Sequence, residues 1–223
     1  MSGFKVVVFD YDGTLFDTRP AIVHCIQRAF AVCGRPVPTL EAAAGTVRTG
    51  LPLQESFIVL DKNLRAEETG LNEIVKAYRK IYLDEGAPLT KPFVGVRDAL
   101  QDIHARGTQC VVVSNKGIAA IRQSLDQSQM SSLVDLVFGD EPGLPKKPDP
   151  AIVVNHILPR YKDVVICTYD CSKFRAAQLM DILKTHPMLI IGGLLQENPF
   201  FVPPDKFLAE LQQRRSYRSR AAS

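Results

Sequence analysis

The sequence lacks a long hydrophobic run. No apolar stretch approaches the roughly 20 residues that a helix needs to cross a membrane. The N-terminus also lacks the pattern of a signal peptide, because its apolar run at residues 4–9 is too short. We therefore expect a soluble protein of the cytoplasm with no membrane partner.

The sequence also has little net charge. The 223 residues carry a formal charge of +3, and four arginines between 214 and 220 supply more than this excess, so the rest of the chain is close to neutral. A nucleic-acid-binding protein needs a basic patch or stripe, which a near-neutral body does not provide. We expect no nucleic-acid partner, and we expect the basic stretch 214–223 to be a disordered tail.

Cysteine and histidine are sparse. The five cysteines are odd in number and scattered, which fits reduced thiols in a cytosolic chain better than a disulfide framework. Cys167 and Cys171 are spaced too widely for a zinc knuckle and have no second pair nearby. None of the four histidines sits where a predicted strand ends, so we assign them no chemistry.

What the sequence does contain is two regions of different periodicity. Between residues 18 and 89 the apolar residues recur at helical spacing and no strand is predicted. Residues 1–17 and 90–213 alternate helices with short runs of Val and Ile, which is typical of βαβ units around a parallel sheet buried on both faces. The sequence therefore predicts an α/β core with a small all-helical module inserted after the first strand.

Individual elements follow from the same patterns. Strands are expected at residues 4–9, 110–113, 134–138, 164–167 and 188–191. Helices are expected at 22–33, 40–44, 53–60, 67–84, 96–105, 118–126, 151–158, 174–183 and 205–213. Gly45, Gly50 and Pro52 are expected to interrupt the helical pattern of the inserted module.

The most informative motif is FDYDGTLFDT, residues 9–18. A short apolar run delivers two carboxylates, Asp10 and Asp12, at its end, and Gly13-Thr14 turns the chain immediately afterwards. An open α/β sheet keeps its ligand crevice at such strand ends. Two acids this close suit covalent catalysis by one carboxylate with acid/base help from the other. A helix cap or a turn explains either aspartate alone, but explains the pair followed by Gly-Thr poorly.

Other polar groups are expected at the same edge of the sheet. Ser114, Asn115 and Lys116 follow the strand at 110–113, Lys147 precedes a helix, and Asp170 follows the strand at 164–167. Carboxylates, a hydroxyl and amines would then converge in one crevice. Such a cluster suits phosphoryl transfer, with the charges of three aspartates balanced by Mg²⁺ and one lysine.

The sequence resembles the haloacid dehalogenase (HAD) superfamily, most closely its phosphoglycolate phosphatase branch. The resemblance rests on FDYDGTLFDT, GLPLQESF, FVGVRDALQDIHARG, VVVSNK and KKPDP, which occur in the family's order. It implies a Rossmann-like, three-layer core with a parallel sheet, residues 1–17 and 90–213, and an inserted all-helical cap, residues 18–89. It also implies a phosphoric monoester hydrolase that acts on a small-molecule phosphomonoester, as a monomer or a weak homodimer.

The resemblance implies roles for individual residues. Asp10 would be the nucleophile that forms an aspartyl-phosphate, and Asp12 would protonate the leaving alcohol and then activate water. Ser114 would hydrogen-bond the transferring phosphoryl group. Lys147 matches the family's charge-neutralising lysine better than Lys146 does, and Lys146 stays the alternative candidate for that role. The acid at Asp12 also argues against a dehalogenase, whose halide leaving group needs no proton.

The implied cofactor is Mg²⁺, with Asp10, Asp12 and Asp170 as its ligands and Asp12 contributing its main-chain carbonyl. The family's last motif normally has a glycine, an aspartate and a second aspartate four residues later. In this chain the glycine is absent. Aligning the motif on Asp170 puts Phe174 at the position of the second aspartate, and aligning it on Ala176-Ala177 puts Tyr169 and Lys173 at the positions of both aspartates. Mg²⁺ usually keeps several waters, so the loss of one ligand is compatible with binding.

Substrate contacts are expected from Thr14, Asn115, Lys116 and the cap residue Arg48. Asn115 could instead orient its own loop, Lys116 and Arg48 could be solvated surface groups, and Ser114 could be a helix cap. Three alternatives to a phosphoglycolate phosphatase-like enzyme stay open. They are a degenerate protein that binds a phosphorylated ligand or partner without turnover, a phosphatase for sugar phosphates or an isoprenoid-type monophosphate, and an interaction module that uses the basic tail.

Overall fold

The computed structural model describes residues 6–161, apart from 50, 66, 67, 148 and 150, together with the backbone of residues 164–167 and 191–192. The chain divides into two compact units. The first contains the described residues up to Phe16, the segment Pro92–Ile118 and the described residues from Ser128 onward. The second contains Asp17–Lys91 and Ala119–Gln127. The core and cap boundaries given by the sequence stay predictions.

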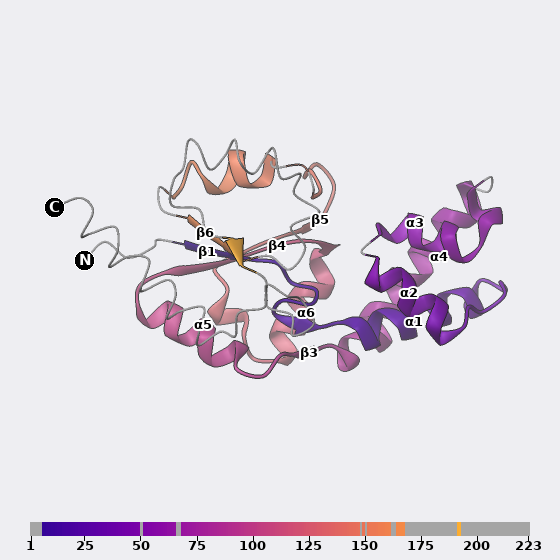
Figure 1. The fold of residues 1–223 in the computed structure, drawn as a ribbon, viewed down its shortest axis with the longest axis horizontal. Coiled ribbons are helices and arrows are strands. Elements are labelled where there is room, and N and C mark those ends of the chain that lie inside the picture. The colour runs from indigo at the N-terminus through magenta and orange to yellow at the C-terminus, as the bar shows by residue number, and fades with distance from the viewer. Residues whose placement is uncertain are drawn as a thin grey trace. The chain divides into compact units, whose positions relative to one another are not determined.

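The first unit is built on a five-stranded sheet with the strand order β5-β4-β1-β6-β7 (Figure 1). The strands are Leu136–Asp140 (β5), Gln109–Gly117 (β4), Val6–Phe9 (β1), Val164–Cys167 (β6) and Ile191–Gly192 (β7). All four neighbouring pairs are parallel. The predicted α/β class with a parallel sheet is therefore confirmed.

Helices cover both faces of this sheet. Figure 1 shows α5, Val96–Ala105, on one side and the segment containing the π-helix Val153–Ile157 on the other. A buried cluster joins the second of these helices to β1 and β4 through Val6, Val8, Val111, Val113, Ile152, Val153 and Ile157. Because a parallel sheet is buried on both faces, its strands read as uninterrupted runs of valine. A short 3₁₀ helix at Ser131–Leu133 precedes β5.

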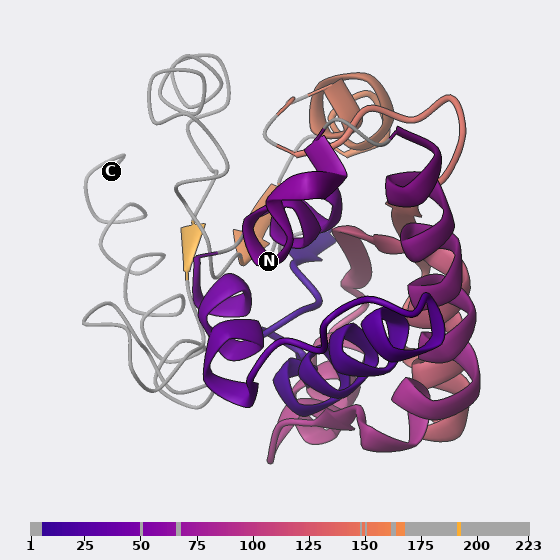
Figure 2. The same cartoon turned by 90° about the vertical axis from the view of Figure 1, so that its right-hand side faces the viewer.

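The second unit is helical over most of its described residues. It contains α1 (Arg19–Val32), α2 (Leu40–Arg48), α3 (Leu53–Leu60), α4 (Glu68–Ile81) and most of α6 (Ile118–Gln127) (Figure 2). Shorter helical turns are 3₁₀ helices at Lys62–Arg65 and Ala87–Leu89 and a π-helix at Tyr82–Gly86. A two-stranded sheet pairs β2 (Phe16–Asp17) with β3 (Lys91–Pro92), and the boundary between the two units falls within both of these strands.

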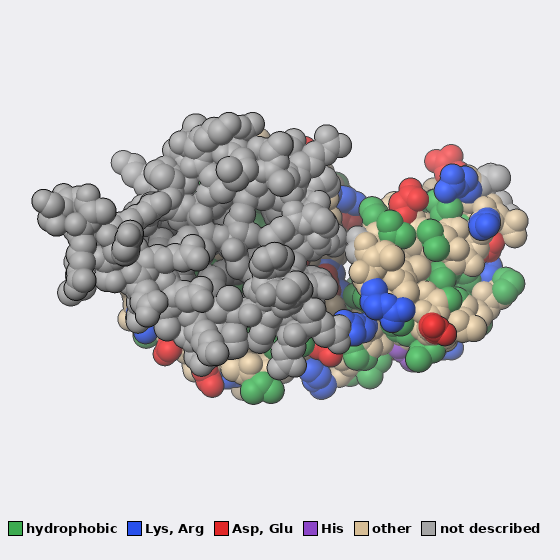
Figure 3. Space-filling model, viewed as in Figure 1, with side chains coloured by type: hydrophobic (Ala, Val, Ile, Leu, Met, Phe, Trp, Pro, Cys, Tyr) green, Lys and Arg blue, Asp and Glu red, His purple; other side chains and the backbone are tan. Residues whose placement is uncertain are grey.

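Aromatic rings hold the helices of the second unit together. The ring of Phe57 lies edge-on to the rings of both Phe30 and Tyr78, with centroids 5.9 and 5.7 Å apart. Edge-to-face pairs of this kind stabilise a core beyond the area that they bury. On the face of this unit seen in Figure 3, hydrophobic, basic and acidic side chains are interspersed.

The expectation that α2 ends before Gly45 is wrong, because the helix continues to Arg48. Its N-terminus is capped by the side chain of Thr39, which accepts a hydrogen bond from the N–H of Ala42 at 3.1 Å. The helix also buries Ala43 and Thr46 on either side of the glycine. A single glycine costs a helix only about 1 kcal/mol, so capping and burial outweigh it.

Some expectations lie outside the described residues. These are the helices at 174–183 and 205–213, the basic tail at 214–223 and most of the strand at 188–191. In the part of the chain that the structure describes, no helix is both long and apolar enough to cross a membrane.

Candidate active site

The first strand ends in a tight turn that carries Asp10 and Asp12. The N–H groups of residues 14–16 all donate to the carbonyl oxygen of Tyr11, at distances of 3.1 to 3.3 Å. Gly13 has a φ of 75°, a conformation that glycine adopts readily and other residues rarely do. The glycine therefore lets the chain reverse directly after the two aspartates.

Asp10 forms a buried ion pair with Lys147. The Lys147 Nζ atom lies 2.7 Å from Asp10 Oδ1, and the two side chains are only 4% and 6% exposed. The same carboxylate oxygen accepts a hydrogen bond of 2.7 Å from the N–H of Tyr11. Buried charges are tolerated when they are paired and hydrogen-bonded, and both conditions hold for Asp10.

Lys146 lies in a different environment. Its Nζ atom is 2.9 Å from Asp140 Oδ1, and its side chain is half exposed. The geometry thus brings Lys147 to the predicted nucleophile and pairs its neighbour with an aspartate at the end of β5.

Residues 114–116 lie within β4, which is longer than the strand predicted at 110–113. Val113 pairs with Phe138 and Gly117 pairs with Asp140, so β4 advances four residues while β5 advances two. A bulge of this kind disrupts the ladder locally and redirects side chains. The strand was predicted too short because Ser114 begins a polar run, whereas the bulge keeps that run inside the sheet.

Asn115 clamps the main chain of Lys147. Its Nδ2 donates to the Lys147 carbonyl oxygen at 2.9 Å, and its Oδ1 accepts from the Lys147 N–H at 2.8 Å. The amide therefore binds both polar groups of that peptide segment, as a neighbouring strand would. Asn115 therefore holds the main chain at Lys147, whereas the sequence suggested that it orients its own loop or contacts the substrate.

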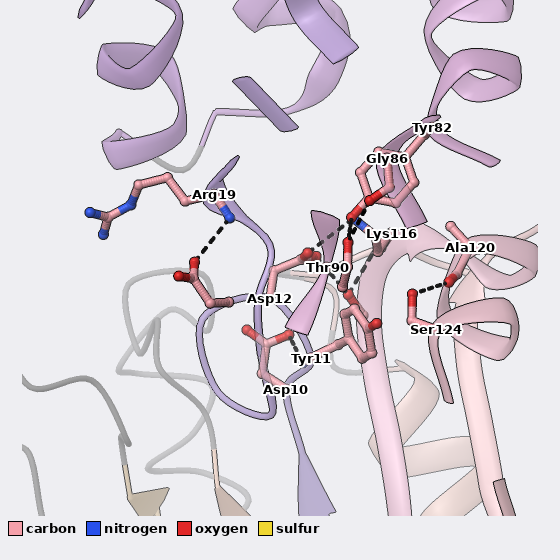
Figure 4. Close-up of polar contacts among 12 residues, drawn as sticks. Asp10, Tyr11, Asp12, Arg19, Tyr82, Gly86, Thr90, Lys116, Ala120 and Ser124 are labelled. Carbon is pink, nitrogen blue, oxygen red and sulfur yellow. Dashed lines mark hydrogen bonds and ion pairs between the residues drawn. The ribbon is translucent and has the colours of Figure 1, made fainter. Parts of the chain in front are cut away.

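Asp12 is held by two groups of the β4 bulge. Lys116 Nζ lies 3.1 Å from Asp12 Oδ1, and Ser114 Oγ lies 3.5 Å from Asp12 Oδ2. Ser114 Oγ also accepts a hydrogen bond of 3.2 Å from the N–H of Lys116. Figure 4 shows Asp10, Tyr11 and Asp12 in succession on the turn, with Lys116 beside them. Lys116 is not the solvated lysine considered above, because only 9% of its side chain is exposed.

The remaining predicted residues lie in varied surroundings. Thr14 is buried, and its Oγ1 has no hydrogen-bond partner among the described residues. Arg48 is exposed in the last turn of α2, in the second unit. Asp170 and Phe174 lie outside the described residues. Burial, and secondarily Asp135, raises the pKa of the Cys110 thiol to about 12, so this β4 thiol is not an additional nucleophile.

The donor atoms of the site fit a hard cation. Asp10 and Asp12 offer carboxylate and main-chain oxygens, which Mg²⁺ prefers, and no sulfur or imidazole ligand is near them among the contacts described above. Among the residues described, no group of three or more His, Cys, Asp or Glu side chains is placed to hold a metal. The third predicted ligand, Asp170, is not among those residues.

Sequence reasoning missed two partnerships in this site. These are the clamp of Asn115 on Lys147 and the ion pair of Lys116 with Asp12. The only signal for them is that all four residues were predicted at one edge of the sheet. Asn115 and Lys116 both lie in the β4 bulge, which the sequence pattern does not reveal.

Known proteins resemble this chain in sequence and in fold. The model of the haloacid dehalogenase-like hydrolase family matches residues 7–162. A phosphoglycolate phosphatase of Aliivibrio fischeri is 29% identical over 161 residues, which cover 70% of this chain and 70% of that protein. One of Cereibacter sphaeroides is 30% identical over 145 residues, covering 65% of this chain and 66% of that protein.

A solved structure supports the fold. A haloacid dehalogenase-like family protein from Streptococcus pneumoniae is 21% identical, covers 93% of this chain and 98% of its own, and has a TM-score of 0.65. At this identity the likeness speaks for the fold alone. The family match, in contrast, spans well over half of the chain. The chain therefore belongs to the haloacid dehalogenase-like hydrolases.

Proposed function

We propose that the chain is a phosphatase that hydrolyses a small-molecule phosphomonoester through an aspartyl-phosphate on Asp10, with Mg²⁺ as its cofactor. The observation that carries the proposal is the buried ion pair in which Lys147 Nζ lies 2.7 Å from Asp10 Oδ1, because Asp10 precedes the turn that also carries Asp12. The family match and the curated phosphoglycolate phosphatases support the phosphatase class.

In the first half of the reaction, Asp10 attacks phosphorus. A bond forms between its carboxylate oxygen and phosphorus, and the bond between phosphorus and the alcohol oxygen breaks. Asp12, protonated when the substrate is bound, gives that proton to the departing oxygen, so that an alcohol leaves and not an alkoxide. Lys147 offsets negative charge at Asp10, which eases the approach of a phosphate dianion.

In the second half, water hydrolyses the aspartyl-phosphate. Asp12, now ionised, takes a proton from the attacking water, and inorganic phosphate leaves with Asp10 regenerated. Ser114, whose side chain is buried beside Asp12, is proposed to hydrogen-bond the phosphoryl oxygens. Asp10 and the main-chain carbonyl of Asp12, with Asp170, would hold Mg²⁺, which supplies further positive charge at those oxygens.

The substrate is proposed to be a small phosphomonoester of the phosphoglycolate type. This assignment rests on the two curated relatives and on the GLPLQESF segment of the cap. Thr14, Asn115, Lys116 and the cap residue Arg48 are the substrate contacts that the motifs suggest. The structure offers a different role for Asn115 and for Lys116, because Lys147 and Asp12 already engage them.

Release of inorganic phosphate from a panel of phosphomonoesters tests the proposal. The panel contains p-nitrophenyl phosphate, 2-phosphoglycolate, sugar phosphates and an isoprenoid monophosphate, each with and without Mg²⁺. We expect Mg²⁺-dependent release by the wild-type protein and none above background by Asp10→Asn. Equal release by the two proteins on every compound would rule the proposal out.

A second candidate is a protein that binds a phosphomonoester without hydrolysing it. It is favoured by the family's last motif, where aligning on Asp170 puts Phe174 at the position of an aspartate. Calorimetry with the same compounds separates the candidates. Saturable binding in Mg²⁺ without phosphate release supports the second candidate, whereas turnover excludes it.

A further inference from the structure

The Lys116 ammonium group occupies an unusual position for a lysine. Its side chain is 9% exposed, although lysines are almost never fully buried without a partner. The Nζ atom lies 3.1 Å from Asp12 Oδ1 and 5.9 Å from the centre of the Tyr11 ring. An ammonium group taken out of water needs such compensation, since its unpaired burial is costly.

The groups around this ammonium are fixed by the fold. Tyr11 is fully buried, and its ring stacks on that of Phe16 with centroids 4.7 Å apart and planes 20° apart. Lys116 itself belongs to the β4 bulge, and its N–H donates to Ser114 Oγ. The lysine is therefore anchored at its main chain and lies beside a rigid aromatic surface.

Asp12 is the more accessible member of the pair. One third of its side chain is exposed, against less than a tenth of that of Lys116. A partly exposed carboxylate on a short turn keeps one rotamer only where neighbouring groups hold it. Lys116 holds one oxygen, and Ser114 lies 3.5 Å from the other.

We infer that Lys116 is a positioning residue, which holds the Asp12 carboxyl group where it can protonate the leaving oxygen. The inference rests on the proposed phosphatase function. It gives Lys116 this role instead of the direct substrate contact expected from the sequence. Proton transfer to a leaving group contributes typically about 10²- to 10⁴-fold, and a displacement of about 1 Å can cost about 10²-fold. Loss of the lysine should therefore remove a large part of the rate enhancement that Asp12 provides.

The leaving group distinguishes positioning of Asp12 from binding of the substrate. An alkyl alcohol needs a proton to leave, whereas p-nitrophenol is acidic enough to leave as its anion. The ratio kcat/KM reports the steps up to departure of the alcohol, so it does not include hydrolysis of the intermediate. In Lys116→Met we expect kcat/KM to fall about 10- to 100-fold for an alkyl phosphate and less than about 3-fold for p-nitrophenyl phosphate.

Lys146→Met is the matched control, because it also removes a lysine from a lysine–aspartate pair in the same unit. It should leave kcat/KM unchanged for both the alkyl phosphate and p-nitrophenyl phosphate. Equal losses of Lys116→Met on both compounds would show that Lys116 contacts the phosphoryl group, and no loss on either would show that it is dispensable. Both results overturn the inference. If Lys116→Met does not fold, Lys116→Gln serves in its place, with the same selective loss expected.

A structural measurement tests the inference without turnover. In a crystal structure of the Lys116 variant, we expect the Asp12 carboxyl group to leave its wild-type position while Asp10 stays paired with Lys147. An unmoved Asp12 contradicts the inference. Absence of phosphate release by the wild-type protein, in contrast, contradicts the proposed function, and the crystal structure still decides whether Lys116 places Asp12.

Discussion

At the scale of single residues, the amide of Asn115 determines where Lys147 lies. Its two hydrogen bonds, 2.9 and 2.8 Å long, hold the carbonyl and the N–H of the lysine's own peptide groups. The lysine side chain then reaches Asp10 from a fixed starting point. The amide thus influences the charge at the nucleophile without touching it.

Replacing Asn115 by leucine should weaken both the fold and the site. One hydrogen bond contributes about 0.5 to 1.5 kcal/mol, so we expect Asn115→Leu to lower the free energy of unfolding by about 1 to 3 kcal/mol. Phosphate release should fall as well, because Lys147 is no longer held beside Asp10. Asn115→Asp keeps only the acceptor for the Lys147 N–H. Its free energy of unfolding should therefore lie between that of the wild type and that of Asn115→Leu. Urea unfolding checks the series, and an unchanged midpoint for Asn115→Leu argues against the clamp.

At the scale of elements, β5 and the start of α6 approach so closely that only glycine fits between them. A Cβ atom added to Gly139 would lie 2.8 Å from Ile118 Cα and 2.9 Å from Ile118 N. Both are main-chain atoms, so one element would have to move. Overpacking of this kind costs typically about 1 to 3 kcal/mol.

We therefore expect Gly139→Ala to lower the free energy of unfolding by about 1 to 3 kcal/mol. Gly117→Ala is the matched control on the paired strand, since a Cβ atom there meets nothing within 4 Å. It should change the free energy by less than about 0.5 kcal/mol, as surface substitutions usually do. Equal effects of the two substitutions, measured by urea unfolding, would contradict the close approach.

In the second unit, an ion pair ties the end of α1 to the end of α3. Arg35 Nη1 lies 2.7 Å from Asp61 Oδ2, and the side chains are 17% and 12% exposed. Burial pushes the pKa of Asp61 upward, but hydrogen bonds from Arg35 and from the main chain of Asn63 outweigh it, so the pKa lies below its usual value. A lowered carboxyl pKa adds stability above the unfolded-state value, and that stability is lost as the pH falls through the folded-state value.

Removal of this pair should have a pH-dependent effect. We expect Arg35→Met to lower the free energy of unfolding by about 1 to 2 kcal/mol at neutral pH. This value lies between the contribution of a hydrogen bond to a charged group, about 1.5 to 3 kcal/mol, and that of an exposed ion pair, about 0 to 1 kcal/mol. The difference from wild type should shrink below about pH 4, where Asp61 of the unfolded chain becomes protonated. Arg28→Met, which removes a more exposed pair with Glu85, should have a smaller effect. A difference that stays constant with pH would show that the ionised Asp61 carboxylate is not stabilised by Arg35.

At the scale of the whole molecule, the sequence predicted what depends on local pattern. The buried valines of β1 and the helical spacing of α5 place those elements within two residues of their observed bounds. The motif at residues 9–18 likewise predicted that Asp10 and Asp12 share one strand end. Tertiary contacts were not predictable: α2 continues through Gly45 with Ala43 and Thr46 buried on either side of it, and Lys116, in the β4 bulge, pairs with Asp12.

During turnover, Asp10 is expected to carry the phosphoryl group. The most direct test is to quench the wild-type protein with acid during hydrolysis of p-nitrophenyl phosphate and to map the phosphorylated peptide by mass spectrometry. We expect one phosphoryl group on Asp10, absent from Asp10→Asn and present on Asp10 in Lys146→Met. Turnover with a phosphoryl group on another residue, or with phosphate release that survives Asp10→Asn, would contradict it.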